Sequence, residues 1–294
     1  MNQYADAAGL VERSAAALVN GIPEHPADDG FFGPSSVAWR ISGDLSAPVA
    51  GLRALMIQAL HPLAMAGVDQ HSDWRADPVG RLAATSAYLA TITFGERGAA
   101  ERAAARVRRI HERVTGVDHE TGKPYAAGDP ELLLWVHAGL IDSNVAAREL
   151  FGTALTPDEA DSYIEEMVVA AELVGVPAEL VPDSRSGLTK YLAWMQPQLL
   201  CTPAARESMA YLLDPPGLDA ELAEIWQDIR EATLISLPEW ARQMYGYTAP
   251  KLTDVRREEI RQALGVLDAV FLGEPGVLEA RQRITLRMRA AVRA

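Results

Sequence analysis

Residues 77–116 read DPVGRLAATSAYLATITFGERGAAERAAARVRRIHERVTG, and this stretch carries the signals of two consecutive helices. Asp77-Pro78 places an N-cap residue before a proline at the first helical position. Gly95 then separates a helix over Pro78–Phe94 from a second over Glu96–Thr115, which Gly116 ends. We therefore expect two helices joined by a short turn.

The same signals recur along the rest of the chain. Asp129-Pro130 repeats the cap and the proline, and Thr156-Pro157-Asp158-Glu159 has the pattern of a capping box. No run of alternating β-branched residues is long enough for a sheet, and Val117 to Gly128 predicts a loop or short hairpin. Further helices are predicted over Tyr4–Val19, Val37–Arg40, Pro48–His61, Asp129–Phe151, Thr156–Val174, Ser184–Met195, Pro203–Leu213, Asp219–Tyr245 with a division at Pro238, Lys251–Leu272 and Pro275–Arg293.

These patterns predict an all-α protein. Its 294 residues are enough for one large domain or two small ones, and the best candidate for a boundary is the loop Asp214–Gly217. No internal repeat supports a division. We expect a single globular multi-helix domain over residues 1–294, built around a buried apolar pocket.

Composition excludes several classes of protein. A net charge of -13 repels nucleic-acid phosphates and anionic headgroups. The lone Cys201 rules out an intramolecular disulfide and a cysteine-based zinc or iron–sulfur site. The first residues lack a signal peptide, and the apolar stretch Gly51–Val68, interrupted by polar residues and a proline, predicts a buried helix rather than a membrane span. We expect a cytoplasmic protein that binds no nucleic acid and does not insert stably into membranes.

His111 is the most informative single residue. Within a helix it shares a face with Ala104, Val107 and Val114. A buried imidazole needs a partner, which can be a carbonyl, a carboxylate or a metal. Taken alone, such a residue is more often a hydrogen-bonded core histidine.

Two other helix faces combine polar and apolar residues. Arg81 and Thr85 share a face with Tyr88 and Ile92, and an arginine and a hydroxyl one turn apart can bind a carboxylate or orient a bound oxygen species. Alternatively, Arg81 forms an interhelical salt bridge and Thr85 bonds its own backbone. In the Asp129–Phe151 helix, His137 lies on an apolar face, and its alternative role is again a core histidine. Three neighbours could belong to the same polar network: Asp142, Asn144 and Arg148.

A basic stripe flanks His111. Its members are Arg102, Arg106, Arg109 and Arg113. They form either a solvated face paired with Glu96, Glu101 and Glu112, or a clamp for acidic groups such as haem propionates.

Known metal motifs fit the sequence poorly. No histidine follows a glutamate at the spacing of di-iron bundles, and no zinc-protease motif, phosphate loop or nucleophile elbow is present. His71-Ser72-Asp73 matches half of a non-haem iron triad that belongs on a β-barrel. Haem, by contrast, needs one axial histidine, an apolar pocket and cations for its propionates. His111 meets that minimum.

Several blocks of sequence, in this order and spacing, resemble a known family. They are Ser36–Arg40, Arg53–Pro62, His71-Ser72, Asp77-Pro78 with Arg81, Thr93–Gly95, Val107–Gly116, Tyr125–Leu133 and Trp135–His137. Together they span roughly Phe31 to Leu200. They resemble the MpaB-type oxygenases, a family that includes the fungal mycophenolic-acid-pathway oxygenase and the latex clearing proteins.

The resemblance implies an all-helical fold and a b-type haem with His111 as the axial, iron-binding histidine. It also implies that Arg81 and Thr85 shape the pocket on the opposite side of the haem. Rubber-cleaving members place a lysine between this arginine and threonine, where the present chain has Leu82, Ala83 and Ala84. Ala84 cannot bind iron, so that side of the haem should be open. With no secretion signal visible, a small or medium apolar substrate inside the cell fits better than rubber.

The sequence thus predicts a haem-b-dependent oxygenase or peroxidase-like oxidoreductase. The metal ligand is His111, the catalytic residues are Arg81 and Thr85, and the cofactor-binding residues are His111, Arg81 and His137. One alternative is a non-catalytic helical protein that binds a lipid-like ligand without haem, in which His111 and His137 are structural and bonded to groups such as Asp142. Another is a non-haem metal bound by some of His61, His71, His111 and His137.

Overall fold

A computed structural model describes residues 9–293, and within them the only regular strands form one short hairpin. The α-helices are α1 Leu10–Gly21, α2 Val37–Ser42, α3 Ala47–Ala59, α4 Pro62–His71, α5 Pro78–Phe94, α6 Arg97–His111, α7 Pro130–Phe151, α8 Pro157–Glu166, α9 Val168–Val174, α10 Arg185–Met195, α11 Pro203–Leu213, α12 Ala220–Ser236, α13 Glu239–Tyr245, α14 Asp254–Gly273 and α15 Val277–Arg293. Two 3-10 turns are η1 Ala178–Leu180 and η2 Gln196–Gln198. Strands β1 Thr115–Val117 and β2 Pro124–Ala126 pair antiparallel, with Gly116 opposite Tyr125. The all-α prediction is confirmed.

Capping residues start the helices where the sequence predicts. Asp77 accepts a hydrogen bond from Gly80 N, and Asp129 accepts one from Glu131 N. Both bonds of the capping box between Thr156 and Glu159 are formed. Each bond satisfies an amide at a helix end that has no partner within the helix.

The helix predicted over Pro48–His61, with Pro62 at its end or at a kink, is confirmed as α3, but the interpretation of Gly51–Val68 as one buried helix is wrong. Helix α3 ends at Ala59, and the chain bends by 103° into α4. The sequence analysis did not predict α4. Pro62 has no amide hydrogen to continue α3, but its fixed φ suits the first position of a new helix. Among the described residues no single helix is long and apolar enough to cross a membrane, and only the bent pair of α3 and α4 reaches that length and composition together.

Smaller differences concern helix ends. The helix predicted over Thr156–Val174 is interrupted at Met167 into α8 and α9. The second helix of the opening stretch ends at His111 rather than Thr115, so Val114 lies beyond it. Part of the prediction Tyr4–Val19 lies outside the described residues, and α1 begins at Leu10.

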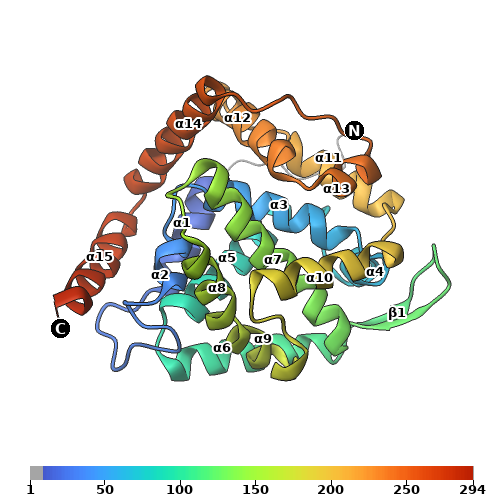
Figure 1. The fold of residues 1–294 in the computed structure, drawn as a ribbon, viewed down its shortest axis with the longest axis horizontal. Helices are drawn as coiled ribbons and strands as arrows, with labels where there is room; N and C mark the ends of the chain where they lie inside the picture. Colours follow the sequence, from blue (N-terminus) through green and yellow to red (C-terminus); the bar gives the residue numbers. More distant parts are fainter. Residues whose placement is uncertain (1–8, 294) are drawn as a thin grey trace.

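The core is built around α3 and α7, which pack against each other at the centre of the molecule (Figure 1). Met56, Ile57 and Trp135 are fully buried between them. Trp135 Nε1 donates to the carbonyl of Gln58 over 3.0 Å. The approach is close at Gly139, where a Cβ would lie 3.3 Å from Ile57 Cγ2.

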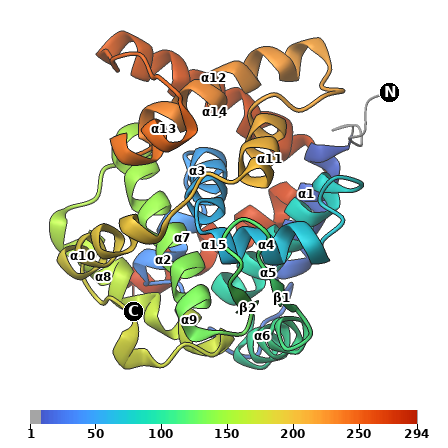
Figure 2. The same ribbon diagram turned by 90° about the vertical axis from the view of Figure 1, so that its right-hand side faces the viewer.

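Other helices cover this pair from two sides. In both views, α11 to α14 lie above α3, whereas α6 and α9 lie at the opposite end of the molecule (Figures 1 and 2). α15 extends from α14 down one flank and packs on α1. Contacts of α5 with α6, α6 with α9, and α9 with α7 link the lower helices in series. The predicted site residues lie on three of these four helices.

Candidate functional site

Arg81 lies in the first turn of α5 and is half-buried. Its Nη1 donates to the hydroxyl of Ser72, at the end of α4. No carboxylate pairs with it among residues 9–293, so the predicted alternative of a salt bridge is wrong. Burial lowers the pKa of this guanidinium from its ordinary value. Arg81 is therefore a partly desolvated cation with capacity for an anionic ligand.

Thr85 lies one turn further along α5 and is exposed. Its hydroxyl donates to the carbonyl of Arg81 over 3.0 Å, which is the local bond given above as its alternative role. Ala84 beside it is also exposed. Tyr88, on the same face, is half-buried, and burial raises the pKa of its hydroxyl to about 12.

His111 is the last residue of α6 and is half-buried. Its Nδ1 is fully buried and has no hydrogen-bond partner in the described part of the chain. Burial lowers the pKa of the imidazole, which keeps the ring neutral. The carbonyl or carboxylate partner of a core histidine is not present. A neutral ring with an unpartnered nitrogen has the chemistry that a metal ligand needs.

The two halves of α6 differ in packing, whereas α5 has buried residues at both ends, including Val79 and Ala83 beside Arg81. Next to the connecting turn, Ile92, Ala100 and Ala104 form a small buried cluster. Beyond Ala104, no residue up to Val117 is fully buried. Given the rise of about 1.5 Å per residue in an α-helix, Arg81 and His111 each lie about 20 Å along their helices from the turn. We call residues 78–85 and 105–111, the ends of α5 and α6 away from the turn, the open end of the α5–α6 pair. The predicted iron ligand lies on one of these helix ends and both predicted catalytic residues lie on the other, with no hydrogen bond or ion pair between them in the described structure.

His137 lies on α7, between Leu133 and Leu140 on the same face. Burial lowers the pKa of its imidazole to about 4, yet the side chain is not fully enclosed. No hydrogen bond holds it in the described structure. In particular, it is not bonded to Asp142, whose Oδ2 instead forms an ion pair with Arg53 at 2.7 Å. The role predicted for His137 as a hydrogen-bonded core residue is not supported.

The predicted polar network on α7 is also wrong, because its three members have separate partners. Asp142 binds Arg53, and Asn144 donates to the hydroxyl of Tyr163 over 2.9 Å. Arg148 donates to the carbonyls of Thr153 and Arg40. These three residues lie close together along α7, but their side chains reach partners in different parts of the fold, which the spacing alone could not predict.

Sequence reasoning missed Arg53 and Ser72. The sequence analysis placed Arg53 in the block Arg53–Pro62 without giving it a role, but it is a buried structural cation. Ser72 was part of a motif with His71, and it proves to be the partner of Arg81. No sequence signal identifies either contact, since both join helices that the prediction did not place together.

The basic stripe on α6 is exposed. Arg102, Arg106, Arg109 and Arg113 form no ion pair within the described residues, so the predicted pairing with neighbouring glutamates is wrong. Arg108, between them, donates instead to the carbonyl of Leu173 at the end of α9. This contact ties α6 to α9.

The remaining histidines do not gather around a metal position. His71 Nε2 lies 3.1 Å from the carbonyl of Thr115, and His61 packs beside Trp135 with ring centroids 6.1 Å apart. Within residues 9–293, no three His, Cys, Asp or Glu side chains are grouped so that they could hold a metal ion. A metal bound through His111 would therefore need ligands from outside the protein, as haem provides.

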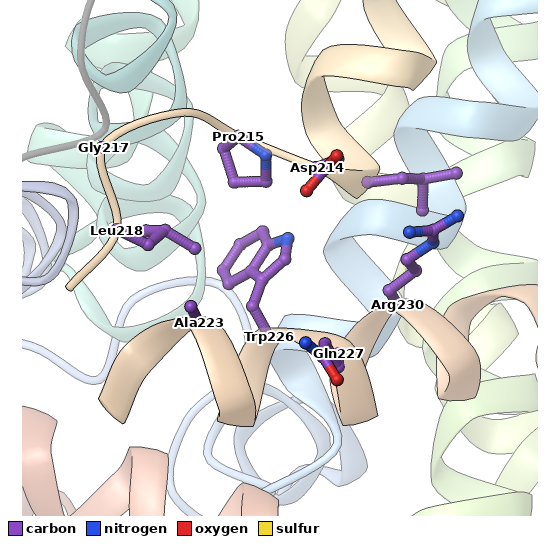
Figure 3. A pocket seen from close by; sticks show the side chains of 9 residues that line it. Asp214, Pro215, Gly217, Leu218, Ala223, Trp226, Gln227 and Arg230 are labelled. Atoms are coloured by element: carbon purple, nitrogen blue, oxygen red, sulfur yellow. The ribbon is translucent and has the colours of Figure 1, made fainter. Parts of the chain in front are cut away.

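A separate hollow lies at the turn between α11 and α12 (Figure 3). It has a volume of about 140 Å³, and Trp226 lies in its centre. The indole Nε1 of Trp226 already donates to the carbonyl of Leu212 over 3.2 Å. None of the predicted site residues lines this hollow.

Comparison with protein families identifies the chain. Residues 39–269 match the model of the catalytic domain of the ER-bound oxygenase mpaB/B′ and rubber oxygenase family. The chain belongs to this family. The match covers α3 to α13 and therefore includes the whole open end of the α5–α6 pair. Neither a search of curated proteins nor a search of solved structures gives a significant match.

Proposed function

We propose that this member of the oxygenase family is a haem-b-dependent oxygenase that acts on an apolar small molecule in the cytoplasm. The observation that carries the proposal is the unpartnered, buried Nδ1 of His111 at the open end of the α5–α6 pair. An orphaned buried nitrogen costs stability unless a ligand engages the ring. In an oxygenase, a neutral histidine in this position is well suited to hold an iron cofactor.

The surrounding residues fit a haem in their donor chemistry. His111 would be the axial ligand, because its lowered pKa leaves the imidazole unprotonated at neutral pH. Arg81 would pair with a carboxylate of the cofactor or substrate, since the protein supplies it with a hydroxyl partner but no carboxylate. Bound haem supplies the one-electron and dioxygen chemistry of an oxygenase.

The other predicted residues have narrower roles in this proposal. Ala84 has no side-chain atom that could bind iron, so this position would supply no second ligand. Thr85 presents a hydroxyl that is already bonded to its own helix, so it orients a ligand only as a hydrogen-bond acceptor. His137 remains neutral, with a pKa of about 4, and offers a hydrogen bond without a charge.

An apolar substrate agrees with the side chains around His137. Leu133 is buried and Leu140 is half-buried on the same face of α7. Tyr88 of α5 adds an aromatic ring that packs beside the Ile92 cluster. These side chains pack in apolar clusters next to the predicted site residues, and apolar surroundings of this kind favour an apolar ligand.

Absorption spectroscopy tests the cofactor directly. Protein expressed with ample haem precursor should show a Soret band, and His111→Ala should remove it. His71→Ala is the matched control, because His71 is exposed and already contacts the Thr115 carbonyl, and it should leave the band intact. A protein that shows no band after haem reconstitution would contradict the proposal and favour a helical binder of lipid-like ligands. Metal in colourless protein would instead indicate a non-haem site.

A further inference from the structure

A second cavity lies under the β1–β2 hairpin, at the start of α4. It has a volume of about 120 Å³. Its polar and charged lining includes His61, Lys123, Asp129, Glu131 and Gln198. His111 and Arg81 do not line it, so it is distinct from the open end of the α5–α6 pair.

His61 is a deeply buried polar residue of this cavity, with 7% of its surface exposed. Its Nδ1 is sealed from solvent without a partner, and the structure gives neither ring nitrogen a hydrogen bond within residues 9–293. Burial is the main cause that lowers the pKa of His61 to about 4. At neutral pH the ring is therefore uncharged. Because Nδ1 is sealed, Nε2 is the nitrogen that can donate an N–H to a ligand.

The first turn of α4 adds further donors. His61 is its N-cap residue, but no side chain caps the helix. Met65 N bonds the His61 carbonyl over 2.9 Å, whereas the amides of Leu63 and Ala64 have no partner among the described residues. These amides lie at the positive end of the helix dipole, which attracts anions.

The charged side chains around the cavity differ in whether they already have an ion-pair or hydrogen-bond partner. Lys123 is exposed and forms no ion pair in the described structure. Asp118 accepts bonds from the amides of Glu120 and Thr121, and Asp129 accepts one from Glu131 N. Among the acids lining the cavity, Glu131 is the carboxylate left without a bond.

We propose that this cavity binds a small carboxylate, with His61 and the free amide of Leu63 as donors and Lys123 as the counter-ion. The size limits the ligand to a few heavy atoms, since a cavity of this volume holds about four waters. A single negative charge fits better than a phosphate, because Glu131 and Asp129 repel a second charge. The planar pair of carboxylate oxygens also matches donors that come from two directions.

Nuclear magnetic resonance of the ¹⁵N-labelled full chain tests this site, with acetate as the probe at constant ionic strength. Acetate should shift the amides of Leu63 and Ala64 saturably, whereas uncharged acetamide of the same shape should bind at least about tenfold more weakly, as expected for a charge-assisted bond. Lys123→Gln should weaken acetate binding roughly tenfold, and Glu131→Gln should strengthen it several-fold. Lys190→Gln, a substitution of an exposed lysine on α10, should leave binding unchanged.

Equal binding of acetate and acetamide would overturn the proposal, because the cavity would then be a simple polar space for water. Equal shifts with chloride, or no effect of Lys123→Gln, would overturn it as well. The His111→Ala variant should bind acetate as the unchanged protein does. The test of the carboxylate site is therefore independent of the test of the haem site.

Discussion

Two arginines inside the same helical fold have opposite surroundings. Arg53 of α3 is 3% exposed, and its guanidinium reaches Asp142, Ser143 and the carbonyl of Ser236 at 2.7–2.9 Å. Arg81 of α5 is half-buried and has only the hydroxyl of Ser72. The first joins α3, α7 and α12, whereas the second lies in the first turn of α5 and bonds only to the end of α4.

The difference separates polar groups that are satisfied within the protein from groups with spare hydrogen-bonding capacity. Folding strongly penalises a desolvated polar group without a partner, so most such groups are satisfied within the protein. Those left unsatisfied in this chain include His111 and His61, each of which lies where a ligand is proposed. Satisfied and unsatisfied groups should respond differently to mutation, and the following experiments test that contrast.

The largest effect is expected at Arg53. Arg53→Met should lower the free energy of unfolding by about 3 kcal/mol or more, because it leaves buried acceptors on three helices without their donor. Urea denaturation measures the change. Arg40→Met is the control, since Arg40 pairs with Glu159 near the surface and should lose less than about 1 kcal/mol. Equal losses in the two variants would contradict the assignment of Arg53 as a structural residue.

A pH effect of intermediate size is expected from His61 and His137. Both have a pKa of about 4 in the folded protein, below the ordinary value of 6.5. The unfolded chain therefore binds protons first as the pH falls from about 6.5 to 4, and stability falls with it. At pH 5 the loss should be about 2 kcal/mol for each residue.

Denaturation at pH 7 and pH 5 measures this dependence. His61→Phe and His137→Phe should each reduce the difference in unfolding free energy between the two pH values. His71→Gln, which changes an exposed histidine, should preserve it. A pH dependence that survives both phenylalanine substitutions would show that other groups cause it.

Arg81 should affect ligand binding more than folding. Arg81→Leu removes one hydrogen bond to Ser72, and in haem-free protein it should change the free energy of unfolding by less than about 1 kcal/mol. If the haem proposal is correct, absorption titration should show haem affinity reduced about tenfold, as expected from loss of a charge-assisted bond. Arg81→Lys, which keeps the charge, should lose less. A large loss of stability with unchanged haem affinity would make Arg81 a structural residue like Arg53.

The smallest effect is expected at Thr85. Its exposed hydroxyl bonds only the carbonyl of Arg81, so Thr85→Val should change stability by less than about 0.5 kcal/mol. Thermal or urea denaturation checks this value. A loss above about 1 kcal/mol would mean that the hydroxyl has a structural partner beyond its own helix.

Local signals in the sequence predicted much of the helical framework. The caps at Asp77, Asp129 and Thr156 place the starts of α5, α7 and α8, because capping depends on residues within one turn. The existence of α4 was not predictable in the same way. A proline after a long apolar run can end one helix or begin another, and here packing selects both, with a bend of 103°.

The sequence by itself determined which residue types could perform chemistry, and it singled out His111, Arg81, Thr85 and His137. Residue type and spacing along a helix depend only on local geometry. The tertiary structure decided which polar groups are satisfied: Asp142 belongs to Arg53, whereas His111 and His137 have no partner within residues 9–293. The tertiary structure also forms the cavity at His61, because segments that are distant in sequence come together around it. Hydrogen-bond partners across helices depend on distances of a few tenths of an ångström, and only the packed chain fixes these distances.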